Sequence, residues 1–252
     1  MHRFFAAGEE NGLVRLAEED ARHARSVLRL RPGDTIELFD ADNRHLAVLT
    51  EVGEKCLCRV TGALPGTEAA LRITLFQGLP KADKLELIAQ KAVELGADSL
   101  VPVAMSRCVV KLNAKDGDKK RERWQKIARE ASKQSGRCRV MTVEAPVSFS
   151  SMLERFAAFD AVLVPWEDCR GLSLKRFAAA HPDIRTLAVV IGPEGGMSAE
   201  EVDRMKERGA LPVTLGPRIL RTETAGLAAV SALMCLYDEM EDPSGAEGDE
   251  QP

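Results

Sequence analysis

Apolar and polar residues alternate along much of the N-terminal part of the chain, as in strands with one buried face. The alternation is clear over residues 35–40 and continues through residues 45–52 and 55–61. Residues 17–28 instead show the spacing of a helix. We therefore expect a small β-rich domain over residues 1–70.

The rhythm changes after residue 70 to apolar strands that alternate with amphipathic helices. The predicted strands are residues 71–77, 99–103, 139–143, 161–166, 186–191 and 211–215. The predicted helices are residues 84–95, 118–134, 149–156, 198–209 and 222–240. Ser198, followed three positions later by Glu201, is a capping box at the start of one helix. This order favours an α/β domain over residues 71–240, with a parallel, doubly wound sheet and helices on both faces.

Composition limits the class of protein. The chain has 252 residues, of which 45% are hydrophobic and 29% charged, an ordinary balance for a soluble globular protein. Apolar runs stay short of the ~18 residues that a membrane span needs. The apolar stretch at the N-terminus is too short for a signal peptide. The six cysteines are scattered without a Cys-x-x-Cys motif, so we expect free thiols in a reducing cytoplasm and no metal site.

The charge of the chain is unevenly distributed. The formal net charge is −4, but seven acidic residues follow Tyr237 with no lysine or arginine among them. Residues 105–141 carry twelve Lys and Arg against four Asp and Glu. A basic segment of this kind fits an RNA partner, with a solvated charged helix as the alternative. The acidic tail, residues 241–252, is predicted to be disordered.

Two glycine-containing loops follow predicted strands, at the edge where ligands bind in open α/β sheets. The first loop reads Gly192-Pro193-Glu194-Gly195-Gly196, and the second, residues 215–225, reads Leu-Gly-Pro-Arg-Ile-Leu-Arg-Thr-Glu-Thr-Ala. Glycine lets a ligand approach the backbone closely. Neither loop has the spacing of a phosphate loop or of a dinucleotide fingerprint, which disfavours a phosphate cradle. A plain tight turn is the alternative for either loop alone.

With these two loops, the chain resembles the RsmE-type 16S ribosomal RNA uridine-N3 methyltransferases of the SPOUT superfamily. The other segments that carry the resemblance are residues 3–5, 23–29, 90–96, 107–111 and 134–137. The resemblance covers residues 1–240. The chain departs from the family pattern at Cys108, where a serine is expected, and at Met141, where a proline is usual.

The resemblance implies a PUA-like RNA-binding domain, then a SPOUT-type sheet that ends in a trefoil knot. It implies a homodimer with S-adenosylmethionine as cofactor and N3 of one uridine in 16S ribosomal RNA as the target. The implied cofactor contacts are Val164, Pro165, Ile191, Gly192, Pro193, Glu194, Gly195, Gly196, Leu215, Gly216, Ile219, Leu220, Thr222, Thr224 and Ala225.

The chemistry of uridine N3 methylation selects two catalytic candidates in the second loop. The reaction develops negative charge on a uracil ring, and the guanidinium of Arg221 can stabilise that charge. Glu223 would orient Arg221 or handle the proton. A general base is often histidine, but the only histidine of the C-terminal domain, His181, lies away from both loops. The alternative for Arg221 and Glu223 is an ion pair that only shapes the loop.

RNA contacts are expected from polar and basic residues in both domains. Aromatic residues make up only 4% of the chain, so a stacking platform for bases is not evident. The expected contacts are Arg22, His23, Arg25, Arg29, Arg107, Lys111, Gln134, Arg137 and Arg218. Two other interpretations remain open. One is a nucleotide-binding α/β enzyme that uses the first loop for phosphate, and the other is a catalytically silent RNA-binding protein.

Overall fold

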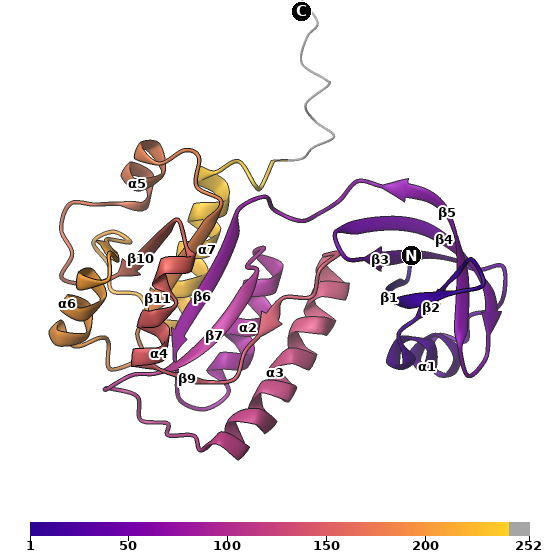
Figure 1. Ribbon diagram of the computed structural model, residues 1–252, viewed down its shortest axis with the longest axis horizontal. Coiled ribbons are helices and arrows are strands. Elements are labelled where there is room, and N and C mark those ends of the chain that lie inside the picture. Colours follow the sequence, from indigo (N-terminus) through magenta and orange to yellow (C-terminus); the bar gives the residue numbers. More distant parts are fainter. Residues whose placement is uncertain (242–252) are drawn as a thin grey trace, which may run out of the picture. The chain divides into compact units, whose positions relative to one another are not determined.

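Helix α3 (Ala114–Ser135) takes part in both of the units into which the chain folds. The computed structural model describes residues 1–241. Unit 1 combines Met1–Glu68 with Arg129–Val140, and unit 2 begins with Ala69–Ala128 and resumes at Met141 (Figure 1). The expected boundary at residue 70 lies close to the junction between Glu68 and Ala69. It does not account for residues 129–140, which belong to unit 1. The predicted disordered tail lies outside the described residues, apart from Glu241.

Unit 1 is a closed barrel with strand order β1-β2-β5-β4-β3. Its elements are β1 (Arg3–Glu10), β2 (Leu13–Leu16), α1 (Glu18–Ser26), β3 (Thr35–Asp40), β4 (Asn43–Val52) and β5 (Cys56–Leu64). Successive side chains of a strand point to opposite faces. Phe4 and Leu38 accordingly lie in the barrel core, whereas their neighbours Phe5 and Phe39 pack in a second cluster with Cys138.

A buried carboxylate explains why residues 129–140 belong with the barrel. Asp20 of α1 is 0% exposed and accepts a hydrogen bond from the backbone amide of Phe5 at 2.9 Å. The same carboxylate pairs with Lys133, and with Arg129 at 3.2 Å. A buried charge is tolerated when it is paired and hydrogen-bonded, so the last turns of α3 dock where Asp20 holds these two cations.

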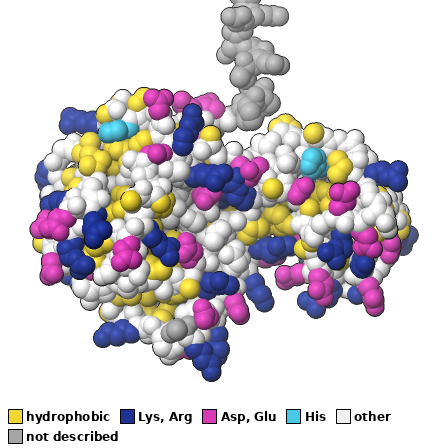
Figure 2. Space-filling view, in the orientation of Figure 1, with side chains coloured by type: hydrophobic (Ala, Val, Ile, Leu, Met, Phe, Trp, Pro, Cys, Tyr) yellow, Lys and Arg dark blue, Asp and Glu magenta, His cyan; other side chains and the backbone are white. Residues whose placement is uncertain are grey.

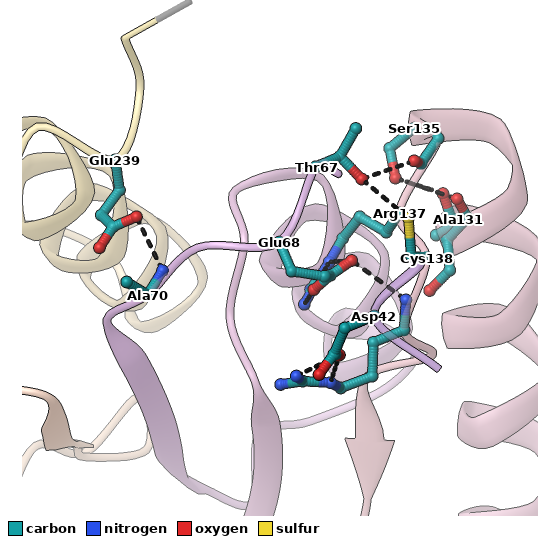
Figure 3. Close-up of polar contacts among 12 residues, drawn as sticks. Asp42, Thr67, Glu68, Ala70, Ala131, Ser135, Arg137, Cys138 and Glu239 are labelled. Atoms are coloured by element: carbon teal, nitrogen blue, oxygen red, sulfur yellow. Dashed lines mark hydrogen bonds and ion pairs between the residues drawn. The ribbon is translucent and has the colours of Figure 1, made fainter. Parts of the chain in front are cut away.

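Further ion pairs join the segment after α3 to Asp42 and Glu68 of unit 1 (Figure 3). Arg137 and Glu68 form a nearly buried pair, with a 2.7 Å contact between Nη2 and Oε2. Glu68 also accepts the amide hydrogen of Arg139, whose guanidinium pairs with Asp42. In unit 2, Glu239 accepts the amides of Ala70 and Leu71 at 2.9 and 2.7 Å, which fixes the start of strand β6.

Unit 2 is a parallel sheet with strand order β12-β10-β11-β6-β7-β8, and β9 pairs with β7. The strands are β6 (Arg72–Gly78), β7 (Ser99–Ala104), β8 (Thr142–Val143), β9 (Val147–Ser148), β10 (Ala161–Pro165), β11 (Thr186–Ile191) and β12 (Leu211–Val213). The helical segments are α2 (Lys84–Glu94), α4 (Phe149–Glu154), η1 (Phe156–Ala158), α5 (Leu174–Ala180), α6 (Ala199–Glu207) and α7 (Thr222–Leu236).

Helices cover both faces of this sheet, as the sequence predicts. On one face, Met152 of α4 and Met205 of α6 share a buried cluster with Phe76 of β6. The neighbouring Leu75 faces α7, where a Cβ on Gly226 would lie 3.4 Å from the Leu75 side chain. The fold class, a small β-barrel followed by a parallel α/β sheet, is thus confirmed. The trefoil knot stays a prediction.

Several elements differ from the sequence prediction. The strand expected over residues 139–143 is limited to Thr142–Val143, because Arg139 is held by Glu68 and Asp42. The helix expected over residues 222–240 ends at Leu236. Helix α5 was not predicted. The capping box of α6 is confirmed, with Ser198 and Glu201 bonded reciprocally.

Candidate functional site

The two glycine-containing loops leave the same edge of the parallel sheet. The first follows β11 and ends at the start of α6, and the second follows β12 and ends at the start of α7. The segment after β6, residues 79–83, leaves this edge too and leads into α2. The carboxyl edge of an open α/β sheet is where ligands bind, so we take these three segments as the candidate site.

A buried polar network ties the first loop to the start of α7. Gln77, at the end of β6, is 0% exposed, and its Nε2 donates to Oγ1 of Thr222 at 2.8 Å. The Thr222 hydroxyl donates in turn to the carbonyl oxygen of Gly192 at 2.6 Å. Buried hydrogen bonds of this kind hold a unique geometry, because leaving any member unpaired is costly.

Lys84, at the start of α2, forms a second link between the first loop and α7. Nζ of Lys84 lies 3.0 Å from Oε1 of Glu194 in the first loop and 3.1 Å from Oε2 of Glu223 in α7. Glu194 also accepts the amide hydrogen of Lys81 at 3.0 Å. The pairings with Glu194, and then with Glu223, raise the pKa of Lys84.

The pKa values of Glu194 and Glu223 shift downwards. Burial by itself would raise the pKa of Glu194, but backbone amides and the Lys84 ammonium outweigh it and lower that pKa. Glu223 has its pKa lowered chiefly by its own backbone amide, with Lys84 and Arg221 adding to the effect. All three groups of the Lys84 cluster are therefore charged near neutral pH.

Arg107 holds the first loop from the side of β7. Its Nη1 donates to the carbonyl oxygen of Gly195 at 3.0 Å. The turn that carries Arg107 is anchored by Glu201 of α6, which accepts the amide hydrogen of Ser106 at 2.8 Å. Arg107, expected as an RNA contact, thus also bears on the geometry of the first loop.

The glycines of the site serve different purposes. A Cβ on Gly78 would lie 2.6 Å from the backbone nitrogen of Pro193, so β6 and the first loop pack backbone to backbone. A Cβ on Gly195 would lie 3.1 Å from Cβ of Arg107. Gly216, with φ +104°, has nothing within 4 Å of the Cβ position. Among these three positions, only Gly216 leaves open space for a ligand.

The second loop presents free binding groups. The side chain of Ile219 is 82% exposed. The backbone amides of Ile219 and Leu220 donate no hydrogen bond to any group among residues 1–241. The loop therefore offers an apolar surface beside unused donors.

Some of the expected cofactor residues are buried, and the others are half-buried or exposed. The side chains of Val164 and Ile191 lie in the core, at 0% and 3% exposed, and Thr222 is committed to the polar network, so these three can offer only backbone. Gly192 and Pro193 are buried as well. The remaining members are half-buried or exposed: Pro165, Glu194, Gly195, Gly196, Leu215, Gly216, Ile219, Leu220, Thr224 and Ala225.

The two catalytic candidates lie next to one another but have different partners. Arg221 is exposed and is the N-cap residue of α7. Glu223 forms its ion pair with Lys84, although the charge of Arg221 contributes to its low pKa. The guanidinium of Arg221 is thus available to a substrate.

The expected RNA contacts are mostly on the surface. Exposed members are Arg22, His23, Arg25, Arg29, Arg107, Lys111, Gln134 and Arg218. Arg137 is the exception, because it is 6% exposed and paired with Glu68, so we withdraw it as an RNA contact. Lysine and arginine side chains are interspersed with acidic ones on the face drawn in Figure 2.

Sequence reasoning did not select Gln77 or Lys84 as site residues. Gln77 sits in an otherwise apolar strand, which could have marked it as a buried polar group with a purpose. Lys84 is a cation in the first turn of a helix, where the helix dipole disfavours positive charge.

No group of three or more His, Cys, Asp or Glu within residues 1–241 is placed to hold a metal ion. Over the same residues, none of the helices has the length and apolar character to cross a membrane.

Comparison with known proteins places the chain in a family. The family described as "RNA methyltransferase domain" matches residues 67–234, and "RNA methyltransferase PUA domain" matches residues 16–62. The ribosomal RNA small subunit methyltransferase E of Bacillus subtilis (strain 168) is 38% identical over 233 residues, which is 89% of this chain and 91% of the relative. That of Mycobacterium bovis is 32% identical, over 89% of this chain and 87% of the relative.

A solved structure agrees with the sequence relatives. The crystal structure of a ribosomal RNA small subunit methyltransferase E from Neisseria gonorrhoeae, bound to S-adenosyl methionine, has a TM-score of 0.79 at 32% identity. It covers 94% of this chain and 98% of its own. The chain belongs to the RNA methyltransferase family that includes the ribosomal RNA small subunit methyltransferase E proteins.

Proposed function

We propose that this protein transfers the methyl group of S-adenosylmethionine to N3 of a uridine in the 16S ribosomal RNA of the small ribosomal subunit. The observation that carries the proposal is the exposed Arg221, held at the junction of both loops. The next residue, Thr222, is bonded to Gly192 of the first loop. Family membership supports RNA as the methyl acceptor, and the names of the relatives point to the small-subunit RNA.

The free groups of the second loop fit S-adenosylmethionine. The exposed Ile219 side chain suits the face of an adenine ring, and the unused amides of Ile219 and Leu220 suit its ring nitrogens.

Bound S-adenosylmethionine supplies an electrophilic methyl carbon to an incoming nucleophile. The nucleophile is the uracil ring, which becomes reactive at N3 when the weakly acidic N3 proton passes to solvent water. As the bond from N3 to the methyl carbon forms, the bond from that carbon to sulfur would break and the thioether product would leave. Arg221 stabilises the negative charge that then spreads to the ring carbonyl oxygens, because its planar fork of donors can span two acceptors. The loops contribute mainly by holding the two reacting atoms in line.

Glu223 has a positioning role in this proposal. Its pKa is lowered by its own amide, Lys84 and Arg221, and a carboxylate with a low pKa is a weak proton acceptor. We therefore assign Glu223 to the placement of charge beside Arg221, not to removal of the N3 proton.

RNA docking involves both units in the proposal. Unit 1 supplies Arg22, His23, Arg25 and Arg29, all exposed, and Gln134 from the end of α3. Unit 2 supplies Arg107, Lys111 and Arg218. Backbone contacts and shape dominate such recognition where aromatic platforms are scarce.

The assembly is proposed to be a homodimer in the cytoplasm. Leu227 and Leu236 of α7 are half-buried within one chain, which leaves apolar area for a second copy. The compartment follows from the proposed substrate, because the small ribosomal subunit is a cytoplasmic particle in bacteria.

The test is methyl transfer from isotopically labelled S-adenosylmethionine to small-subunit RNA, offered both as assembled subunits and as free RNA. We expect label in the RNA with the wild-type chain and at least about 10²-fold less with Arg221→Ala, the usual effect of losing one anion-stabilising donor. No incorporation into either substrate, from a folded protein, contradicts the proposal. Calorimetric titration with ATP and NAD in parallel tests the nucleotide-enzyme alternative.

A further inference from the structure

We propose that Lys84 is a positioning residue for methyl transfer, which sets the first loop against the start of α7 by holding Glu194 and Glu223 on one ammonium group. This inference rests on the proposed function and extends it to a residue in a third segment of the site. The geometry is direct, since Nζ lies 3.0 Å from the Glu194 carboxylate and 3.1 Å from the Glu223 carboxylate.

The position of Lys84 in its own helix argues for a role outside that helix. Lys84 is the first residue of α2, and a cation at a helix N-terminus opposes the helix dipole. The side chain is only 29% exposed, because it lies against the two carboxylates and not in solvent. Departures from local rules of this kind collect at functional sites.

Lys84 reduces the repulsion between the carboxylates of Glu194 and Glu223. The side chains of Glu194 and Glu223 are 28% and 20% exposed, so water screens their mutual repulsion incompletely. Oε2 of Glu223 is buried, and the Lys84 ammonium 3.1 Å away is the charge that compensates it. Without the ammonium, two like charges would push the first loop and α7 apart.

The contacts of Lys84 also affect the position of Arg221. Glu223 lies two positions after Arg221, and the same turn of α7 contains Thr222, which is bonded to Gly192. The first loop is thus held to this turn at two points, a buried one through Thr222 and a half-buried one through Lys84. Loss of the second tie loosens Arg221 relative to the loop without removing any residue that touches substrate.

The experiment compares Lys84→Met, Lys84→Arg and Lys91→Met with the wild-type chain. Lys91 is the matched control, because it lies on the same helix and pairs with Glu94 at 2.8 Å, away from the loops. For each protein we would measure the Kd for S-adenosylmethionine by calorimetry, and kcat and KM for both substrates, at pH 8.

We expect Lys84→Met to weaken S-adenosylmethionine binding about tenfold or more at pH 8 and to lower kcat, with the KM for RNA unchanged. Lys84→Arg should keep most of the binding, and Lys91→Met should match the wild type. Adding Glu194→Gln to Lys84→Met should recover part of the lost affinity.

Several results would overturn the inference. One is a folded Lys84→Met that binds S-adenosylmethionine within twofold of Lys91→Met. Another is a loss of affinity that Glu194→Gln does not relieve and that only follows the free energy of unfolding. If Lys84→Met does not fold, Lys84→Arg with a tenfold loss of affinity would also contradict it. These outcomes differ from a failure of the proposed function, in which the wild-type chain itself transfers no methyl group.

Discussion

Thr222 donates its hydroxyl proton to the carbonyl oxygen of Gly192 at 2.6 Å, which joins the start of α7 to the loop after β11. Gln77 completes the contact from the end of β6, with Nε2 2.8 Å from Oγ1 of Thr222. Three segments far apart in the sequence thus meet at one buried hydroxyl group. Because these segments form the candidate site, this hydroxyl links the stability of the unit to its proposed activity.

Replacing Thr222 by valine keeps the shape of the side chain and removes the hydroxyl. We expect a loss of about 1–3 kcal/mol in the free energy of unfolding, since the buried amide of Gln77 loses one of its acceptors and the carbonyl of Gly192 loses the hydroxyl donor. Thr222→Ser should lose much less. Urea unfolding measures the stability, and calorimetry with S-adenosylmethionine measures the site. A valine variant as stable as the wild type, with unchanged affinity, would show that the network does not hold the loops.

Arg221→Lys tests whether Arg221 acts by geometry or by charge alone. An ammonium group cannot fork across two acceptors, so lysine should restore little of the activity lost in Arg221→Ala. Binding of RNA should change little in either variant. The measurements are single-turnover methyl transfer and RNA affinity at fixed salt concentration. Equal losses in affinity and turnover would instead reassign Arg221 to docking of the RNA.

Asp20→Ala tests how the end of α3 is held on the barrel. The substitution leaves Arg129 and Lys133 without their buried counter-charge, and we expect a loss of about 3 kcal/mol in the free energy of unfolding. The control is Asp203→Ala, which breaks an exposed pair with Lys206 and should cost under about 0.5 kcal/mol. Similar effects of the two substitutions in urea unfolding would refute the assigned role of Asp20.

Glu201 gives a prediction about pH. Burial would raise its pKa, but the amides of Ser106 and Ser198 outweigh burial and lower it below the ordinary value. A carboxylate with a lowered folded-state pKa stabilises the protein above its unfolded pKa, and this contribution disappears as the pH falls through the folded-state pKa. Glu201→Gln should therefore cost about 1–2 kcal/mol at pH 7 and progressively less below about pH 4.3.

Urea unfolding at pH 7, 5, 4 and 3.5 measures this dependence. The neighbouring Glu200 is exposed, so Glu200→Gln should differ little from the wild type at each pH. A difference between the wild type and Glu201→Gln that stays constant, or grows as the pH falls, would contradict the assigned role of Glu201.

The sequence predicts the elements of this fold well where the pattern is local. The strand Thr186–Ile191 and the capping box of α6 follow directly from apolar periodicity and from Ser198 and Glu201. The division of the chain could not be predicted in this way, because it depends on long-range partners. Asp20 and Glu68 hold residues 129–140 on the barrel, so a cut at residue 70 would leave those residues without them.

The candidate site, too, is predictable from the sequence only where its signals are local. Local motifs indicate both loops and the exposed Arg221. They do not indicate Lys84, because its role depends on bringing Glu194 and Glu223 together from separate segments. They also place Arg137 wrongly, because its positive charge suggests RNA while its partner, Glu68, lies 69 positions away in the sequence.

Identification of the methylated nucleoside tests the proposed methyl transfer. After reaction with S-adenosylmethionine, the small-subunit RNA would be digested to nucleosides and analysed by mass spectrometry against synthetic standards. We expect a single new product, uridine methylated at N3, which is absent without enzyme and strongly reduced with Arg221→Ala. A methyl group found at a ribose 2′-oxygen, at C5 of the ring or on another base would contradict it.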